Sequence, residues 1–110
     1  MSVVLYVRVE SDLDPEELER RLLERMPRFR EVPGLEQKVY GRDPETGDVC
    51  GIYFFESEAS LAAFRESELA RTIASAYEAV DVRRESYEVL HALWPDRGPF
   101  SDPVRHRLDG

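Results

Sequence analysis

Two short apolar segments constrain the fold of this chain more than any other feature: residues 3–9 (VVLYVRV) and residues 49–55 (VCGIYFF). The first alternates, with valine or leucine at the odd positions and Val4, Tyr6 and Arg8 at the even ones, which is the period of a strand. The second is apolar at almost every position, as expected of a strand buried on both faces. Together they predict a sheet with these two segments at its centre.

A helix is predicted between them, over residues 14–29. Asp14 can cap its first turn, Pro15 suits the first helical position, and Glu17 is placed to complete a capping box. The apolar side chains recur every three or four residues, as on a helix packed against a sheet. They are Leu18, Leu22, Leu23, Met26 and Phe29.

The rest of the chain supplies two further strands and a second helix. Residues 32–42 form a more polar strand, which suits a sheet edge, and residues 43–48 (DPETGD) form a hairpin turn. The second helix is capped by Ser57, bends near Ser67 and continues to about residue 77, and residues 80–90 form the last strand. The order β-α-β-β-α-β predicts an α+β, ferredoxin-like fold, an antiparallel four-stranded sheet with helices on one face.

Two regions are expected, a ferredoxin-like domain over residues 1–90 and a Pro-rich C-terminal arm over residues 91–110. The arm has too many prolines for a regular helix or central strand. It is nevertheless apolar at several positions, and we expect its stretch from Leu93 to Phe100 to dock on a partner subunit or across a pocket mouth. The alternative is a frayed end.

The amino-acid composition and charge argue against several classes of protein. The formal net charge of −8 opposes binding to nucleic acid or to an anionic membrane surface. The chain has no apolar run near the roughly 20 residues of a membrane span and no signal-peptide pattern, and its single cysteine, Cys50, lies in an apolar strand. A cytoplasmic location is therefore expected. Of the 15 Lys and Arg residues, only Lys38 is a lysine.

The face of the sheet away from the helices is predicted to be rich in aromatic side chains. Tyr6, Arg8, Tyr40 and Tyr53 are all expected on it. One domain cannot leave so many rings in water, so a partner or a ligand must cover them. The sequence therefore predicts a homodimer.

Two segments resemble a known family. VPGLEQKVY (residues 32–40) and GIYFFESEASLAAF (residues 51–64) are similar to motifs of the YdhR-like monooxygenases, which belong to the dimeric α/β-barrel superfamily and are related to the antibiotic-biosynthesis monooxygenases. The resemblance covers roughly residues 1–90. It implies a dimeric α/β barrel, a pocket between sheet and helices or at the barrel centre, and oxidoreductase activity without a cofactor.

The sequence departs from the family in residues that matter for chemistry. Glu68 stands where relatives often have a histidine, the chain contains no asparagine, and its tryptophan, Trp94, lies in the arm. Catalytic residues therefore cannot be transferred from the family motifs.

The candidate site consists of tyrosines and cations. Cofactor-independent oxygenation of a phenol-like substrate requires that the substrate lose a proton and that its anion be held, which Arg and Tyr side chains can do. The predicted catalytic residues are Tyr53 and Arg8, and the predicted substrate-binding residues are Tyr6, Lys38, Tyr40 and Tyr87. The same residue types are also enriched at protein interfaces.

No metal or cofactor site is expected. His91 and His106 have no further ligands at a suitable spacing, and Cys50 has no histidine in a recognisable pattern. The sequence thus predicts a cofactor-independent monooxygenase acting on a small aromatic or polycyclic phenol-like substrate. The alternatives are a non-enzymatic small-molecule-binding protein and a structural dimer.

Overall fold

The computed structural model describes residues 2–98, and the elements follow the predicted order. The second helical region is divided into three pieces by two breaks. Ser67 ends one helix and caps the next by accepting a hydrogen bond from the Ala70 amide, and Thr72 separates the second piece from the third. The elements are β1 (Val3–Ser11), α1 (Pro15–Phe29), β2 (Leu35–Arg42), β3 (Val49–Phe55), α2 (Glu58–Glu66), α3 (Glu68–Arg71), α4 (Ile73–Ala76) and β4 (Ala79–Glu88).

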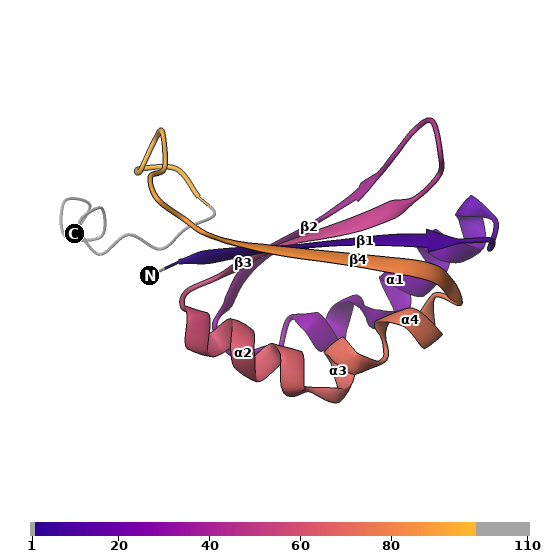
Figure 1. Cartoon of the computed structure of the whole chain (residues 1–110), viewed down its shortest axis with the longest axis horizontal. Coiled ribbons are helices and arrows are strands. Elements are labelled where there is room, and N and C mark those ends of the chain that lie inside the picture. Colours follow the sequence, from indigo (N-terminus) through magenta and orange to yellow (C-terminus); the bar gives the residue numbers. More distant parts are fainter. Residues whose placement is uncertain (1, 99–110) are drawn as a thin grey trace.

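The four strands form one antiparallel sheet in the order β2-β3-β1-β4. The two most apolar strands are the central ones, as predicted, and the helices lie on a single face of the sheet (Figure 1). This confirms the ferredoxin-like α+β fold. No helix among residues 2–98 is long and apolar enough to cross a bilayer.

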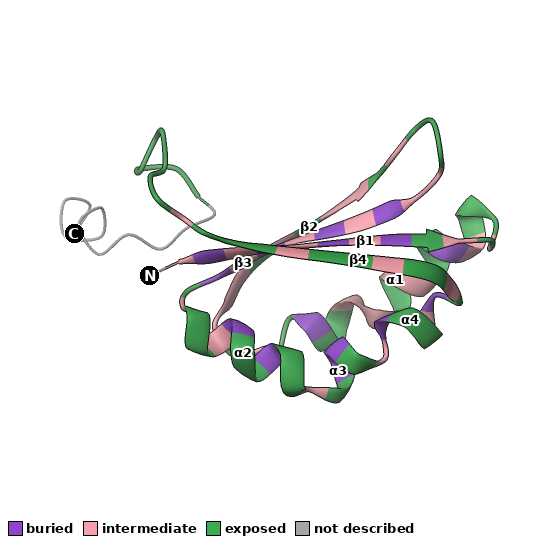
Figure 2. Cartoon of the chain, in the orientation of Figure 1, coloured by how far each residue is buried: buried purple, intermediate pink, exposed green. Residues whose placement is uncertain are grey.

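The core lies between the sheet and the helices, where the buried residues gather (Figure 2). Strand β1 contributes the side chains at its odd positions, and Leu5 pairs with Tyr53 of β3. Four rings pack together here, with centroid separations of 5.3 to 6.1 Å. They belong to Phe29, Tyr53, Phe55 and Phe64.

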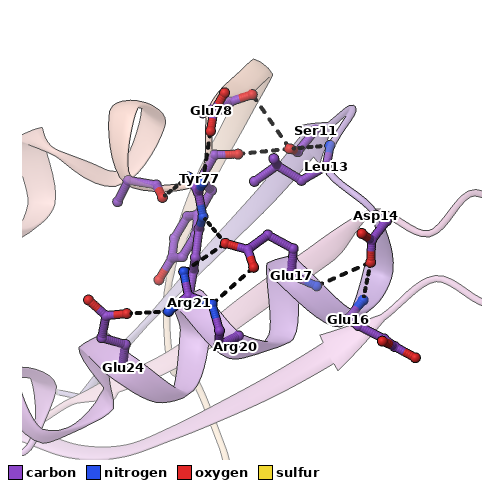
Figure 3. Close-up of polar contacts among 11 residues, drawn as sticks. Ser11, Leu13, Asp14, Glu16, Glu17, Arg20, Arg21, Glu24, Tyr77 and Glu78 are labelled. Atoms are coloured by element: carbon purple, nitrogen blue, oxygen red, sulfur yellow. Dashed lines mark hydrogen bonds and ion pairs between the residues drawn. The ribbon is translucent and has the colours of Figure 1, made fainter.

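Helix α1 begins as expected, but its first turn differs in one detail. The Asp14 carboxylate accepts hydrogen bonds from the Glu16 and Glu17 amides (Figure 3). The expected capping box does not form, since the Glu17 carboxylate instead binds the guanidinium groups of Arg20 and Arg21. These ion pairs hold the pKa of Glu17 well below its usual range, to about 2.

The turn between α4 and β4 is fastened to the first half of the chain. The Ser11 hydroxyl donates to the Tyr77 carbonyl at 2.7 Å, and Arg21 donates to the Ala76 carbonyl and pairs with Glu78 (Figure 3). Tyr77 is consequently held under the sheet beside α1, next to the site described below.

One further backbone hydrogen bond follows β4 before the C-terminal arm begins at residue 91. The Val89 amide donates to the Ser2 carbonyl, and the side chains of Leu93 and Trp94 are 80% and 55% exposed. These side chains therefore remain available for a partner, and docking of the arm stays a prediction. Phe100, His106 and the rest of the arm lie outside the described residues.

Two leucines of α1 offer a matched test of which helix face is buried. Leu18 is 1% exposed, whereas Leu23, expected to widen the apolar stripe, is 58% exposed. Leu18→Ala should lower the free energy of unfolding by about 2–5 kcal/mol, because it leaves a cavity in the core. Leu23→Ala should change it by less than about 0.5 kcal/mol. Chemical denaturation measures both, and equal losses would contradict this helix orientation.

Candidate functional site

The sheet separates the six predicted site residues into two groups. Lys38 pairs with Tyr53, and Tyr53 pairs with the core residue Leu5, so this row of side chains faces the helices. Tyr40 lies two positions after Lys38 and therefore on the same face. The second group alternates to the open face and comprises Tyr6, Arg8 and Tyr87. The six residues therefore do not share one face of the sheet, because alternate positions of a strand point to opposite faces.

Tyr53 lies under the helices, not on the open face where it was predicted. It is 2% exposed, and its ring packs against Phe29, Phe55 and Phe64. The prediction failed because β3 is apolar at both odd and even positions, so polarity did not reveal which face was inward. Burial raises the pKa of the Tyr53 hydroxyl, which keeps it protonated.

The Arg8 side chain forms its hydrogen bonds with residues of the hairpin turn between β2 and β3. Its Nη2 donates to Asp43 at 2.8 Å and to Thr46, and its Nε donates to Asp48 at 3.0 Å. The hydrogen bond from Arg8 lowers the pKa of Asp43 to about 2. With two carboxylates on one guanidinium, this cluster carries a net negative charge and holds the hairpin in place, which leaves little attraction for an anionic substrate.

Lys38 lies in an aromatic cage. Its Nζ is 3.3 Å from the centroid of Phe29, 4.3 Å from that of Tyr40 and 4.4 Å from that of Tyr53. No carboxylate among residues 2–98 forms an ion pair with it. Desolvation, with a smaller contribution from the positive charge of Arg25, lowers the pKa of Lys38 to about 7. Much of this amine is therefore uncharged near neutral pH.

Gly51 provides the space for the lysine side chain. A Cβ atom at this position would lie 2.9 Å from Cε of Lys38 and 3.0 Å from Cε1 of Tyr53, closer than side chains tolerate. The missing side chain thus allows Lys38 to extend across β3 toward the helices.

Arg25 and Tyr77 lie beyond the rings of the cage, and Tyr77 lines the space under the sheet next to Lys38. Arg25 donates to the Leu69 carbonyl at 2.9 Å, and its guanidinium lies 5.5 Å from the ring centroid of Tyr77. Arg25 is thereby fixed as a second positive charge near Lys38. Burial raises the pKa of Tyr77, while a hydrogen bond from Arg25 opposes this shift.

Two cavities meet at Lys38 and Tyr40, which line both. The larger has a volume of about 350 Å³ and opens between the end of α1 and strand β2. Its other lining residues are Met26, Phe29, Arg30, Leu35, Glu36 and Gln37. The smaller, about 20 Å³, reaches under the sheet to Tyr77.

The Tyr40 hydroxyl is a potential donor at this site. It is buried and has no hydrogen-bond partner among the described residues. Desolvation raises the pKa of Tyr40 to about 12. It therefore remains protonated at neutral pH and could donate a hydrogen bond to a bound ligand. Within residues 2–98, no group of three or more His, Cys, Asp or Glu side chains is placed to hold a metal ion.

The chain matches the model of one protein family, described as "Putative mono-oxygenase ydhR", over residues 4–94. The chain belongs to this family. The match includes Lys38, Tyr40 and Tyr53, so the cage lies within the family region. No curated protein is similar enough in sequence to match.

Solved structures confirm the fold at low sequence identity. SnoaB, a cofactor-independent oxygenase from Streptomyces nogalater, superposes with a TM-score of 0.70 at 14% identity, covering 84% of this chain and 96% of its own. Rv0793 from Mycobacterium tuberculosis gives a TM-score of 0.69 at 16% identity, covering 86% and 100%. A dimeric ferredoxin-like protein from Thermobifida fusca gives 0.62 at 11% identity, covering 80% and 92%.

Sequence reasoning named Lys38, Tyr40 and Tyr53 but missed the partners that give them their properties. Phe29 was recognised as inward-facing, but neither Phe29 nor Gly51 was named as part of the site. Arg25 and Tyr77 were not singled out. The available signal was the two-residue spacing of Lys38 and Tyr40, which places them on one strand face.

Lys38→Met tests the buried amine through the pH dependence of stability. In the unfolded chain the amine has its ordinary pKa near 10.5, whereas in the folded chain the pKa is about 7. Between these values the unfolded state binds more protons, so wild-type stability should rise with pH, by at most about 1.4 kcal/mol per pH unit from this group. The variant lacks this contribution and should gain most over wild type at pH 7.

Denaturation in guanidinium chloride at pH 7, 8 and 9 measures the difference between the two proteins. The matched control is Arg28→Met, which removes an exposed cation from α1 and should give a difference independent of pH. A pH-independent difference for Lys38→Met as well would mean that the ammonium group is fully solvated.

Proposed function

We propose that this protein is a cofactor-independent monooxygenase that binds a small aromatic, phenol-like substrate between α1 and the sheet, with Lys38 as the general base. The observation that carries the proposal is the Lys38 amine, which lies among three rings at the wall of a 350 Å³ cavity and forms no ion pair with any residue from 2 to 98. Membership of a family described as mono-oxygenases supports this reaction class.

The chemistry requires a proton acceptor and a site for an anion. The neutral amine of Lys38 takes a proton from the substrate, which leaves an electron-rich carbanion or phenolate. This anion reacts with molecular oxygen to form a carbon–oxygen bond, and the resulting peroxide anion takes the proton back from Lys38. The hydroperoxide then loses water, with the remaining hydrogen of the same carbon, and leaves a carbonyl group. One oxygen atom enters the product and the other leaves in water.

The surrounding residues favour the charged intermediate. Once protonated, Lys38 lies with Arg25 on the positive side of the site, and both can stabilise the substrate anion electrostatically. The Tyr40 hydroxyl can donate a hydrogen bond to the same anion. The Phe29 ring lines the larger cavity together with Leu35 and Met26, which gives an aromatic substrate an apolar wall.

Oxygen uptake with anthrone as the probe tests this function. Wild-type kcat/KM should rise with pH and reach half its maximum near pH 7, because the base must be deprotonated. Lys38→Met should lower kcat/KM by about 10²-fold or more, and Arg28→Met should leave it unchanged. If Lys38→Met retains full activity, the base lies elsewhere. If anthrone binds without oxygen uptake, the protein is a binding protein and not an oxygenase.

We further propose that two copies associate through the open face of the sheet. Apolar side chains alternate onto this face from several strands, and Val39 and Tyr87 are largely exposed on it. The dimeric relative from Thermobifida fusca supports this assembly. The helix-side cavity would remain accessible in such a dimer.

Charge placed on this face should separate the subunits. Ile52 lies in the central strand β3 and pairs with Tyr6, with its side chain on the open face. Light scattering at micromolar concentration should give a dimer mass for wild type and a monomer mass for Ile52→Glu, because a buried unpaired carboxylate is costly. The control Leu23→Glu, on the exposed side of α1, should stay dimeric. A monomeric wild type would refute this assembly.

A further inference from the structure

Lys38 is the only side-chain amine in the chain, since the other 14 basic residues are arginines. A guanidinium group is always protonated in proteins and is not a nucleophile under ordinary conditions. A neutral amine has a free electron pair and can attack electrophilic carbon. Any chemistry that requires a nucleophilic side-chain nitrogen of lysine must therefore occur at this one residue.

The setting of Lys38 differs from that of a surface lysine in two ways. Its Nζ is surrounded by three rings and has no ion-pair partner in the described part of the chain, so the ammonium form is poorly stabilised relative to water. Lys38 also lines the open 350 Å³ cavity, which gives a small molecule a route to the amine. A buried lysine that small molecules could not reach would be inert. Lys38 is both desolvated and accessible from the cavity.

We propose that Lys38 is a covalent site that forms an imine with small aromatic aldehydes. The amine electron pair attacks the carbonyl carbon and forms a carbon–nitrogen bond. A proton moves from nitrogen to the former carbonyl oxygen, and the carbon–oxygen bond then breaks with release of water. No oxidant or reductant takes part, so this reaction goes beyond the proposed oxygenation and does not depend on it.

The neighbouring residues suit each stage of this reaction. The Tyr40 hydroxyl, buried and without a hydrogen-bond partner in the described residues, can donate a proton to the departing oxygen. The Phe29 ring lines the cavity beside the amine and can contact the aryl group of the aldehyde. The site around Lys38 can thus bind the aldehyde as well as react with it, unlike a surface amine.

The charged and titratable groups around the amine come from every element packed against it. They are Arg25 of α1, Arg30 just after α1, Glu36 and Tyr40 of β2, Tyr53 of β3 and Tyr77, which follows α4. The tyrosines stay neutral below pH 9 because burial raises their pKa values. Reactivity between pH 6 and 9 should therefore follow the amine itself.

The test uses benzaldehyde with sodium cyanoborohydride, which reduces an imine to a stable benzyl amine. The reaction is run without oxygen at pH 7, and peptide mass mapping distinguishes Lys38 from the N-terminal amine. At pH 7 an ordinary lysine is neutral in roughly one molecule in 10³. Lys38 in the folded protein should therefore be labelled at least about tenfold faster than in the same chain unfolded in guanidinium chloride.

Two variants serve as controls for the labelling rate of Lys38. Arg28→Lys places an ordinary, exposed lysine on α1 as an internal standard, and Lys38 should react at least about tenfold faster than this standard in the folded protein. Gly51→Ala should reduce labelling of Lys38 in the folded state alone, since the new Cβ would displace the lysine side chain. Circular dichroism confirms that each variant is folded.

The opposite ranking would overturn the proposal. If Lys38 reacts more slowly than the lysine at position 28, and faster after unfolding, the cage shields the amine and no imine site exists. This outcome is independent of the oxygenase test, because labelling needs no oxygen and oxygen uptake needs no imine. Loss of oxygen uptake with normal labelling would refute the oxygenase and leave the imine site intact.

Discussion

The antiparallel pairing of β1 with β3 determines which side chains of the sheet face the helices. Leu5 is opposite Tyr53 in that pairing, and Tyr53 is in turn opposite Lys38 of β2, so a single row of the sheet carries all three side chains toward the helices. A shift of β3 by one residue relative to β1 would move Tyr53 to the open face and break up this row. The cage, the lowered pKa of Lys38 and the cavity all depend on this row.

The same pairing leaves the protein with two chemically different faces. On the helix side, aromatic rings surround one amine and an arginine bound to backbone carbonyl oxygen. On the open side, Arg8 and two aspartates fix the hairpin between β2 and β3, among apolar side chains. The helix side is thus suited to binding a small molecule, and the open side is suited to association.

The fold could be predicted from the sequence because each element has a clear local signal. The odd positions of β1 are all apolar, Asp14 and Ser57 cap helices, and the Pro44 hairpin turn separates β2 from β3. The division of the site could not be predicted in the same way. Strand β3 is apolar on both faces, so nothing local shows that Tyr53 is inward and Ile52 outward. That information resides in long-range pairing, which a single sequence does not display.

The burial of Lys38 and its lowered pKa could not be predicted from the sequence either. A lysine in a polar edge strand looks like a solvated residue, and its burial depends on the absence of a side chain at Gly51 and on the ring of Phe29, which is distant in the sequence. Arg8, in contrast, had the appearance of an anion-binding residue, and only the fold shows that Asp43 and Asp48 already occupy it. In both cases the partner determines the chemistry of the residue.

The scarcity of lysine has a practical consequence for handling the protein. Reagents that attach proteins to a surface or to a dye through lysine have one lysine target on this chain, and that lysine lines the cavity between α1 and β2. Such reagents will either mark the N-terminal amine or enter the cage and block it. Attachment through the amino terminus at mildly acidic pH, or through an added tag, would leave the cavity open for ligand measurements.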